Sequence, residues 1–392
     1  MILYITYDGI MEPLGQSQVL AYLKRLASDR KIHLVSFEKP DDWRRVEERE
    51  AIARRIRDGG IHWHPRRYHK RPSALATAWD ISIGITTGLW LILRHRLRIV
   101  HARSYVPSVM ALVLKRVTGA AFIFDMRGFW ADERVDGGLW SRNGRMYRVA
   151  KWFERKFLLS ADHVVSLTHA GLREMQAFDY LQGHMPPVTV IPTCADLDRF
   201  RPLPVEKSTD FVLGYVGSAG TWYLFDATVA CFVQLRTLRP DARLLIINRN
   251  EHDYIRERLA AGGVPLDTYE LRSAGHAEIP QLMALMDATV FFIKPVFSKQ
   301  ASAPTKLGEF LGCGIPCLAN AGVGDMAEIL EGDRVGVAIH SFEPEALAAG
   351  LQRLLALLGE PDIHERCVDA ARRNFSLEHG VSRYTSIYQR LE

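Results

Sequence analysis

The sequence predicts an α/β protein built from two Rossmann-like domains. Short apolar runs alternate with glycine- and proline-containing loops and with helical segments, and this order occurs twice along the 392 residues. A chain of this length is also long for a single hydrophobic core. The periodicity breaks near 201–210, where prolines, a lysine and a serine follow one another. We therefore expect domains at 1–200 and 201–376.

Composition places the chain among ordinary globular proteins. Its hydrophobic content of 48% with 24% charged residues excludes disorder as the main state. Five unevenly spaced cysteines do not form a disulfide framework and point to a reducing compartment. Cys313 and Cys317 lack the second Cys or His pair of a zinc site. No secretory signal precedes the first strand, so we expect a cytoplasmic protein.

Charge is distributed unevenly between the two halves. Residues 1–200 contain 31 Lys and Arg against 21 Asp and Glu, whereas the remainder contains 19 against 24. Basic clusters at 66–71, 94–98 and 142–156 carry the excess. They are either solvated helix faces or a footprint on an anionic surface such as lipid headgroups.

The first domain opens with a strand at 1–6, a turn-rich loop ending at Gly15, and a helix at 16–27. A strand at 32–37 and a charged helix at 43–58 follow. Residues 74–93 contain one charge, Asp80, and are just long enough to span a bilayer. Ser, Thr and Gly through their centre favour instead a helix packed in the domain, with Trp79 and Trp90 near a membrane interface.

Polar residues end two strands of the first domain, at 99–104 and 122–128. Ligands gather at the carboxyl ends of strands in open α/β sheets. Asp125 and Arg127 are two residues apart, so their side chains point the same way while the strand lasts. They are our acceptor-side catalytic candidates, and the alternative is a structural ion pair. Further strands are expected at 163–167 and 188–191.

The second domain repeats this order. A strand at 211–216 leads through a glycine loop at 217–223 into a helix at 224–238. The next strand, 243–248, is followed by Arg249, and a helix at 278–286 feeds a strand ending at Lys294. A leucine-rich helix at 345–358 and an amphipathic helix at 377–391 complete the chain.

The segment from Lys299 to Glu331 carries the main site prediction. Small residues at 301–304 precede a helix at 306–311, and the N–H groups of such a helix start suit a phosphate or sugar oxygen. Lys306 in the first turn and Glu309 three residues later lie on one helix face. A strand at 315–319 and a helix at 326–330 follow.

The order P-T-K-L-G-E-F-L-G-C-G-I-P-C, followed by A-G-V-G-D-M-A-E-I-L, resembles the donor-site signature of retaining GT-B glycosyltransferases of family 4. The resemblance implies two Rossmann-like domains facing across an interdomain cleft, with the last helix, 377–392, packing back on the first domain. It implies that Glu309 holds the nucleotide ribose and that residues before the helix cup the sugar and diphosphate: Ala301, Ser302, Ala303 and Thr305. It also places loop residues near the donor, namely Gly15, Gln16, Gly217 and Ser218. Asp125 would reach the donor sugar, and residues 271–276 would support the base.

Two departures from the family pattern change the expected chemistry. The first acid of its E-x7-E arrangement is replaced by Ala301, and the loop at 217–223 lacks the usual Arg and Lys. The positive charge for the diphosphate must then come from another residue. The available cations are Lys306, which we rank first, and Arg249, Lys294 and Lys299.

We therefore expect a glycosyltransferase that moves a sugar from a nucleotide-diphosphate donor to an acceptor hydroxyl with retention, without a metal or other cofactor. The basic first domain favours a lipid-linked or saccharide acceptor in cell-surface polysaccharide or glycolipid assembly, at the inner face of the cytoplasmic membrane. One alternative is a nucleotide-sugar 2-epimerase of the same fold. The other is a non-enzymatic basic module that binds membranes or nucleic acid, although no nucleic-acid-binding motif is present.

Overall fold

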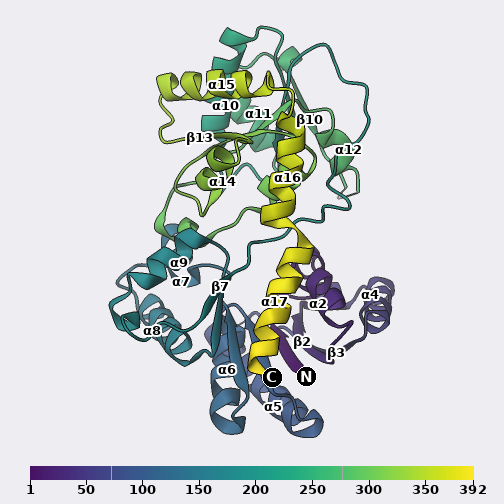
Figure 1. The fold of residues 1–392 in the computed structure, drawn as a ribbon, viewed down its shortest axis with the longest axis vertical. Coiled ribbons are helices and arrows are strands. Elements are labelled where there is room, and N and C mark those ends of the chain that lie inside the picture. The colour runs from purple at the N-terminus through teal and green to yellow at the C-terminus, as the bar shows by residue number, and fades with distance from the viewer. Residues whose placement is uncertain (72, 276) are drawn as a thin grey trace. The chain divides into compact units, whose positions relative to one another are not determined.

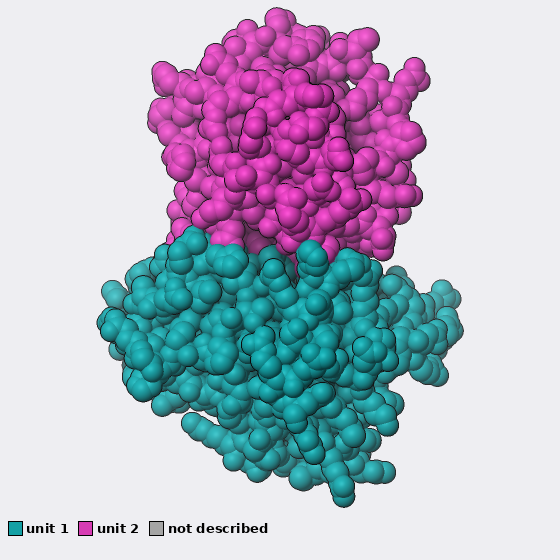
Figure 2. Space-filling model, in the orientation of Figure 1, with its two compact units in different colours: residues 1–192, 377–392 teal, residues 193–376 magenta. Residues whose placement is uncertain are grey.

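The computed structural model describes residues 1–71, 73–275 and 277–392, and the chain forms two compact units. The first unit contains residues 1–192 and 377–392, and the second contains residues 193–376, as coloured in Figure 2. Each unit is a parallel sheet flanked by helices (Figure 1), which is the predicted Rossmann-like architecture.

The first unit contains a seven-stranded sheet in the order β3-β2-β1-β4-β5-β6-β7. Its strands are β1 Ile2–Thr6, β2 Ile32–Glu38, β3 Ile61–Arg67, β4 Ile99–Arg103, β5 Ala121–Asp125, β6 His163–Ser166 and β7 Val188–Val190. Strand β3 was not predicted, and its residues 66–67 were assigned to a basic cluster. It is an edge strand of half-exposed His, Arg and Pro side chains, so it lacks the apolar run of a buried parallel strand.

The helices of the first unit are α1 Pro13–Gly15, a π-helical turn Gln16–Leu20, α2 Ala21–Leu26, α3 Pro40–Trp43, α4 Val46–Asp58, α5 Ser73–His95, α6 Tyr105–Thr118, α7 Trp130–Asp136, α8 Arg145–Ser160, α9 His169–Gln176 and α17 Leu377–Leu391. The helix predicted at 16–27 therefore begins with a π-helical turn and continues as α2. Helix α17 belongs to the first unit, where Tyr384 stacks edge-on against Tyr22 of α2 and Glu378 pairs with Arg25.

The second unit contains a six-stranded sheet in the order β10-β9-β8-β11-β12-β13. The strands are β8 Val212–Val216, β9 Arg243–Ile247, β10 Tyr269–Arg272, β11 Ala288–Val290, β12 Cys317–Asn320 and β13 Gly336–Ile339. The helices are α10 Phe225–Leu238, α11 His252–Ala261, α12 Ile279–Met283, α13 Thr305–Gly312, α14 Met326–Gly332, α15 Pro344–Leu358 and α16 Ile363–Phe375. The expected support for the base at 271–276 overlaps the end of β10, and His276 lies outside the described residues.

The unit boundary falls at 192/193, eight residues before the one we expected. The N–H of Ala195 donates to the carbonyl of Phe375 at 2.9 Å, and Phe200 is buried. Gly312 makes this packing possible, because a Cβ there would lie 2.6 Å from the carbonyl oxygen of Phe200. Residues 193–200 therefore pack with the second unit, so the proline-containing stretch at 201–210 is not the junction.

Candidate functional site

The start of helix α13 is built as the sequence predicted. A 3₁₀ turn, Phe297–Ala301, is followed by extended residues and by the helix from Thr305, with Pro304 at the N-cap. No side chain caps this helix start in the described chain, so its first-turn N–H groups do not have a carboxylate or hydroxyl of the protein as partner. Ala301 is buried, whereas Ser302, Ala303 and Thr305 are half-buried.

Lys306 reaches from the first turn of α13 to the carboxyl end of strand β8. Its Nζ donates to the carbonyl oxygen of Val216 at 2.8 Å and lies 3.7 Å from the ring centroid of Tyr223. The rings of Tyr215 and Phe291 lie at 5.5 and 5.2 Å. Burial among these rings lowers the pKa of Lys306 to about 7, although nearby carboxylates oppose that shift. Near pH 7 part of the Lys306 population is therefore a neutral amine, which can gain a proton when an anion arrives.

Gly217 is required where Lys306 approaches the loop. Its φ is +107°, and a Cβ there would lie 2.9 Å from Lys306 Nζ. Ser218, the next residue, is exposed, and its carbonyl accepts a hydrogen bond of 2.6 Å from the Tyr215 hydroxyl. The glycine at residue 217 thus gives the side chain of Lys306 room to contact the first residues of the loop at 217–223.

Glu251 occupies the N–H groups of the same loop, which sequence reasoning missed. Its carboxylate accepts from the N–H groups of Ala219 and Gly220 at 2.9 and 3.0 Å, and from Asn248 Nδ2 at 2.9 Å. Desolvation opposes ionisation, but these hydrogen bonds outweigh it and lower the pKa of Glu251. A phosphate would therefore find these two N–H groups already paired with a carboxylate of the protein.

A second lysine lies against the end of this loop. Lys299 Nζ lies 3.8 Å from the ring centroid of Trp222, the residue next to Tyr223. Two adjacent aromatic residues of the loop thus each contact a lysine from the segment before or within α13. This arrangement brings Lys299 and Lys306 to the loop that lacks its own Arg and Lys.

Glu309 lies one turn after Lys306 and is half-buried. Burial raises the pKa of Glu309 to about 7, and the charges of Lys306 and Arg199 limit the shift. Lys306 and Glu309 therefore both titrate near neutrality. Arg249 and Lys294 are exposed and follow β9 and β11 at the same carboxyl edge of the sheet as Gly217. The predicted cations thus share this edge. The side chain of Lys306 contacts the loop, and Lys294 contacts it through its backbone N–H, which donates to the Trp222 carbonyl at 3.0 Å.

In the first unit, Asp125 ends strand β5 and is buried. Its side chain is 2% exposed, accepts from the Tyr384 hydroxyl at 3.1 Å and lies 3.4 Å from His101 Nε2. Burial opposes ionisation, yet the charge of Arg127, the hydrogen bond with His101 and the charge of Arg103 outweigh it and hold the pKa of Asp125 below its usual range. The carboxylate faces Tyr384 of helix α17, which is a structural contact, and the expected contact of Asp125 with a donor sugar remains a prediction.

Arg127 lies 3.8 Å from Asp125 through Nη1, which is the ion pair that we had kept as the alternative. Its φ of +58° is uncommon for a residue other than glycine, and it occurs at the carboxyl end of β5. At the end of the neighbouring strand β4, the buried Arg103 pairs with Asp8, whose side chain is 41% exposed. Asp8 and Arg103 are polar groups at this sheet edge that our prediction did not select.

Gly15 and Gln16 hold the first loop together. A Cβ at residue 15 would lie 2.1 Å from the carbonyl oxygen of Gly9, so this loop closes only over a glycine. The side-chain amide of Gln16 donates to the Met11 carbonyl at 3.4 Å and accepts from Arg55 at 3.1 Å. These contacts are structural, and the expected contacts of both residues with a donor remain a prediction.

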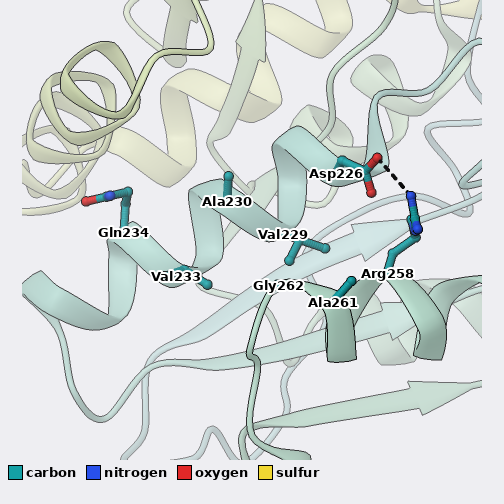
Figure 3. A pocket seen from close by; sticks show the side chains of 8 residues that line it. All are labelled: Asp226, Val229, Ala230, Val233, Gln234, Arg258, Ala261 and Gly262. Carbon is teal, nitrogen blue, oxygen red and sulfur yellow. Dashed lines mark hydrogen bonds and ion pairs between the residues drawn. The ribbon is translucent and has the colours of Figure 1, made fainter.

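A pocket of about 420 Å³ lies on the second unit between helices α10 and α11 (Figure 3). Its wall is made mainly of small apolar side chains, and Arg258 and Asp226 form an ion pair of 3.4 Å beside it. None of the predicted site residues lines it. Within residues 1–71, 73–275 and 277–392, no three His, Cys, Asp or Glu side chains are grouped so that they could hold a metal ion.

Comparisons with known proteins agree with this architecture. Residues 16–194 match the glycosyl transferase 4-like domain, and residues 210–357 match the glycosyl transferases group 1 family. A glycosyltransferase from Rickettsia africae ESF-5 has a similar structure, with a TM-score of 0.73 at 15% identity over 100% of this chain and 98% of that one. The HepE protein of Anabaena in complex with UDP has a TM-score of 0.68 at 15% identity over 99% of each chain. Sucrose-phosphate synthase from Thermosynechococcus elongatus has a TM-score of 0.72 at 14% identity over 100% of this chain and 98% of its own.

No curated protein sequence matched this chain. The two family matches nevertheless reach across both units, and the solved structures share the fold over nearly the whole length. The chain therefore belongs to the GT-B glycosyltransferases of the group 1, family 4-like type.

Proposed function

We propose that this protein transfers a sugar from a nucleotide-diphosphate donor to an acceptor hydroxyl with retention of configuration. The observation that carries the proposal is the pair Lys306 and Glu309 on the first turns of α13, with Lys306 Nζ against the start of the loop at 217–223. The structures of HepE with UDP and with UDP-glucose support a nucleotide-sugar donor by similarity of fold.

Lys306 and the N–H groups at the start of α13 meet the diphosphate. Negative charge builds up on the diphosphate as the sugar leaves, so a cation fixed beside it stabilises the transition state more than the bound donor. Lys299 supplies a second cation at the other end of the loop, against Trp222. Since Glu251 fills the Ala219 and Gly220 N–H groups, the lysines take the larger share of the diphosphate charge.

Glu309 accepts hydrogen bonds from the ribose hydroxyls. A charged acceptor makes each such bond worth roughly 1.5 to 3 kcal/mol. The carboxylate must be ionised for this role, and burial has raised its pKa to about 7. Donor binding therefore draws a proton from Glu309 in weakly acidic solution.

Retention follows from front-face attack. The bond between the anomeric carbon and the diphosphate breaks, and the acceptor oxygen bonds to that carbon on the same face. The acceptor proton passes to the leaving phosphate oxygen, so no carboxylate is needed where Ala301 replaces the usual acid. The lysines supply the positive charge that a metal ion provides in other transferases, so the reaction is metal-independent.

The acceptor belongs to cell-surface polysaccharide or glycolipid assembly at the inner face of the cytoplasmic membrane. The support is the charge of the first 200 residues, 31 basic against 21 acidic, which suits anionic headgroups.

A thermal-shift panel of UDP-, GDP-, ADP- and TDP-sugars tests the donor assignment. A donor at 100 times its Kd should stabilise the folded chain by about 2.7 kcal/mol, and Glu309→Ala should remove most of that shift at the same concentration. Product analysis with donor alone separates transfer from 2-epimerisation, which needs no acceptor. If no nucleotide sugar raises the melting temperature, the donor site is misassigned.

A further inference from the structure

Helix α5 exposes an apolar stripe along the surface of the first unit. The side chains of Leu75, Trp79, Trp90 and Leu93 are 71%, 59%, 57% and 69% exposed. At about 100° per residue, these four positions fall within an arc of about 60° on the helix. Single exposed apolar side chains are common on protein surfaces, but these four form one line along the helix.

The polar residues within the stripe have their hydroxyl groups bonded inside the helix. Ser82 Oγ donates to the Ala78 carbonyl at 3.0 Å, and Thr86 Oγ1 donates to the Ser82 carbonyl at 3.0 Å. A hydroxyl whose proton is already bonded to the preceding turn loses less on leaving water. The middle of the stripe is therefore compatible with an apolar surrounding.

The opposite side of α5 is fixed to the domain. The buried Asp80 accepts from the Tyr7 hydroxyl at 2.7 Å and from the His69 N–H at 3.0 Å. Gly84 and Gly88 allow close packing on α6, since a Cβ at these positions would lie 2.3 Å from Met110 Sδ and 2.7 Å from Leu114 Cδ1. By length and composition alone, residues 74–95 could cross a membrane. If the helix left the domain to cross a membrane, the Asp80 carboxylate would lie in the bilayer without its hydrogen-bond partners. The helix therefore stays packed on the domain and exposes only its apolar face.

Along the sequence, the exposed charges next to the stripe are of one sign. Between Lys70 and Arg98 the sequence contains five basic residues, and its one acid is the buried Asp80. The basic side chains are exposed and lie at the two ends of the helix: Lys70, Arg71, Arg94, Arg96 and Arg98. Each contributes roughly 1 kcal/mol of attraction near an anionic bilayer.

We propose that helix α5 docks flat on an anionic phospholipid bilayer, with Leu75, Trp79, Trp90 and Leu93 in the headgroup region and the terminal arginines on lipid phosphates. Tryptophan and leucine between basic ends are the composition of an interfacial helix. The exposed basic ends would repel one another across a paired second copy, which disfavours self-association through this face. The inference deepens the membrane location proposed above, and its test needs no sugar transfer.

Flotation of the full chain with vesicles tests this surface. The vesicles contain phosphatidylcholine alone or with about one third phosphatidylglycerol, and binding is expected to the anionic set. W79A/W90A should reduce the bound fraction at least tenfold, and so should R71E/R94E. Matched controls come from helices α3 and α4. W43A/V46A removes exposed apolar side chains and R54E/R57E reverses exposed charges, and both should bind as the parent chain does.

Three results would overturn the proposal. The first is the absence of binding to anionic vesicles by a chain that is folded by circular dichroism. The second is equal loss of binding in the α5 variants and in their α3–α4 controls. The third is a dimer, seen by sedimentation, that W79A/W90A dissociates without any change in vesicle binding. Because donor-induced thermal shifts do not involve α5, failure here would leave the donor assignment untouched.

Discussion

Donor binding should exchange protons with solvent, and the direction should reverse near pH 7. In the free protein the pKa values of Lys306 and Glu309 both lie at about 7. A bound diphosphate requires the charged lysine, and ribose hydroxyls require the ionised carboxylate. Donor binding therefore charges Lys306 by proton uptake above pH 7 and ionises Glu309 by proton release below it.

The magnitude follows from those two pKa values. At pH 8 about nine tenths of the Lys306 side chains are neutral and take up a proton on binding, whereas about one tenth of the Glu309 side chains are protonated and release one. Binding therefore takes up about 0.8 proton in total. At pH 6 the proportions reverse, and binding releases about 0.8 proton. Donor affinity should consequently be highest near pH 7 and fall by up to about tenfold per pH unit on either side.

Calorimetry in two buffers of different ionisation enthalpy measures this proton number directly. A nucleotide sugar is the ligand of choice, because its diphosphate diester does not titrate between pH 6 and 8. Lys306→Met should abolish the uptake at pH 8 and keep the release at pH 6, whereas Glu309→Gln should do the opposite. If the parent chain and both variants exchange the same number of protons, neither side chain meets the donor and the site reasoning is wrong.

Three substitutions test the packing around the sites. Gly15→Ala should lower the free energy of unfolding by about 2 kcal/mol or more, because the new Cβ meets the Gly9 carbonyl, and an unchanged urea midpoint would contradict the loop geometry. Tyr384→Phe should cost about 1 kcal/mol of stability through its bond to Asp125 while donor affinity holds, and a loss of donor affinity without a loss of stability would instead indicate that Asp125 acts at the donor site. Gly217→Ala should weaken donor binding at least tenfold by displacing Lys306 Nζ and straining a φ of +107°, whereas Gly332→Ala, which meets nothing within 4 Å, should leave it unchanged by calorimetry.

Most elements of the fold could be predicted because their signals are local. Strands such as β1 and β5 are almost wholly buried, so they read as continuous apolar runs. Strand β3 was not predicted, because an edge strand with one exposed side tolerates His, Arg and Pro65 and so lacks a continuous apolar run. The proline-containing stretch at 201–210 led us to predict the domain boundary eight residues after the observed one. Phe200 packs against residues that are distant in the sequence, such as Gly312, and this packing has no local signal.

The candidate site likewise contains features that local spacing predicts and features that depend on distant residues. Lys306 and Glu309 share a helix face, which three residues of spacing already determine. The partners of these groups come from far along the chain: Val216 is 90 residues from Lys306, and Tyr384 is 259 residues from Asp125. No spacing rule links such residues.

By itself, the sequence determined the two Rossmann-like halves, a helix start within one residue of 306 and the placement of a lysine and a glutamate on one face of that helix, because helical and strand periodicities act over a few residues. Only the tertiary structure decided that Asp125 is buried beneath α17, that Glu251 fills the loop N–H groups, and that aromatic rings shift the pKa of Lys306. The physical reason is that desolvation and hydrogen bonding depend on which distant side chains surround a group, and that neighbourhood exists only once the chain has folded.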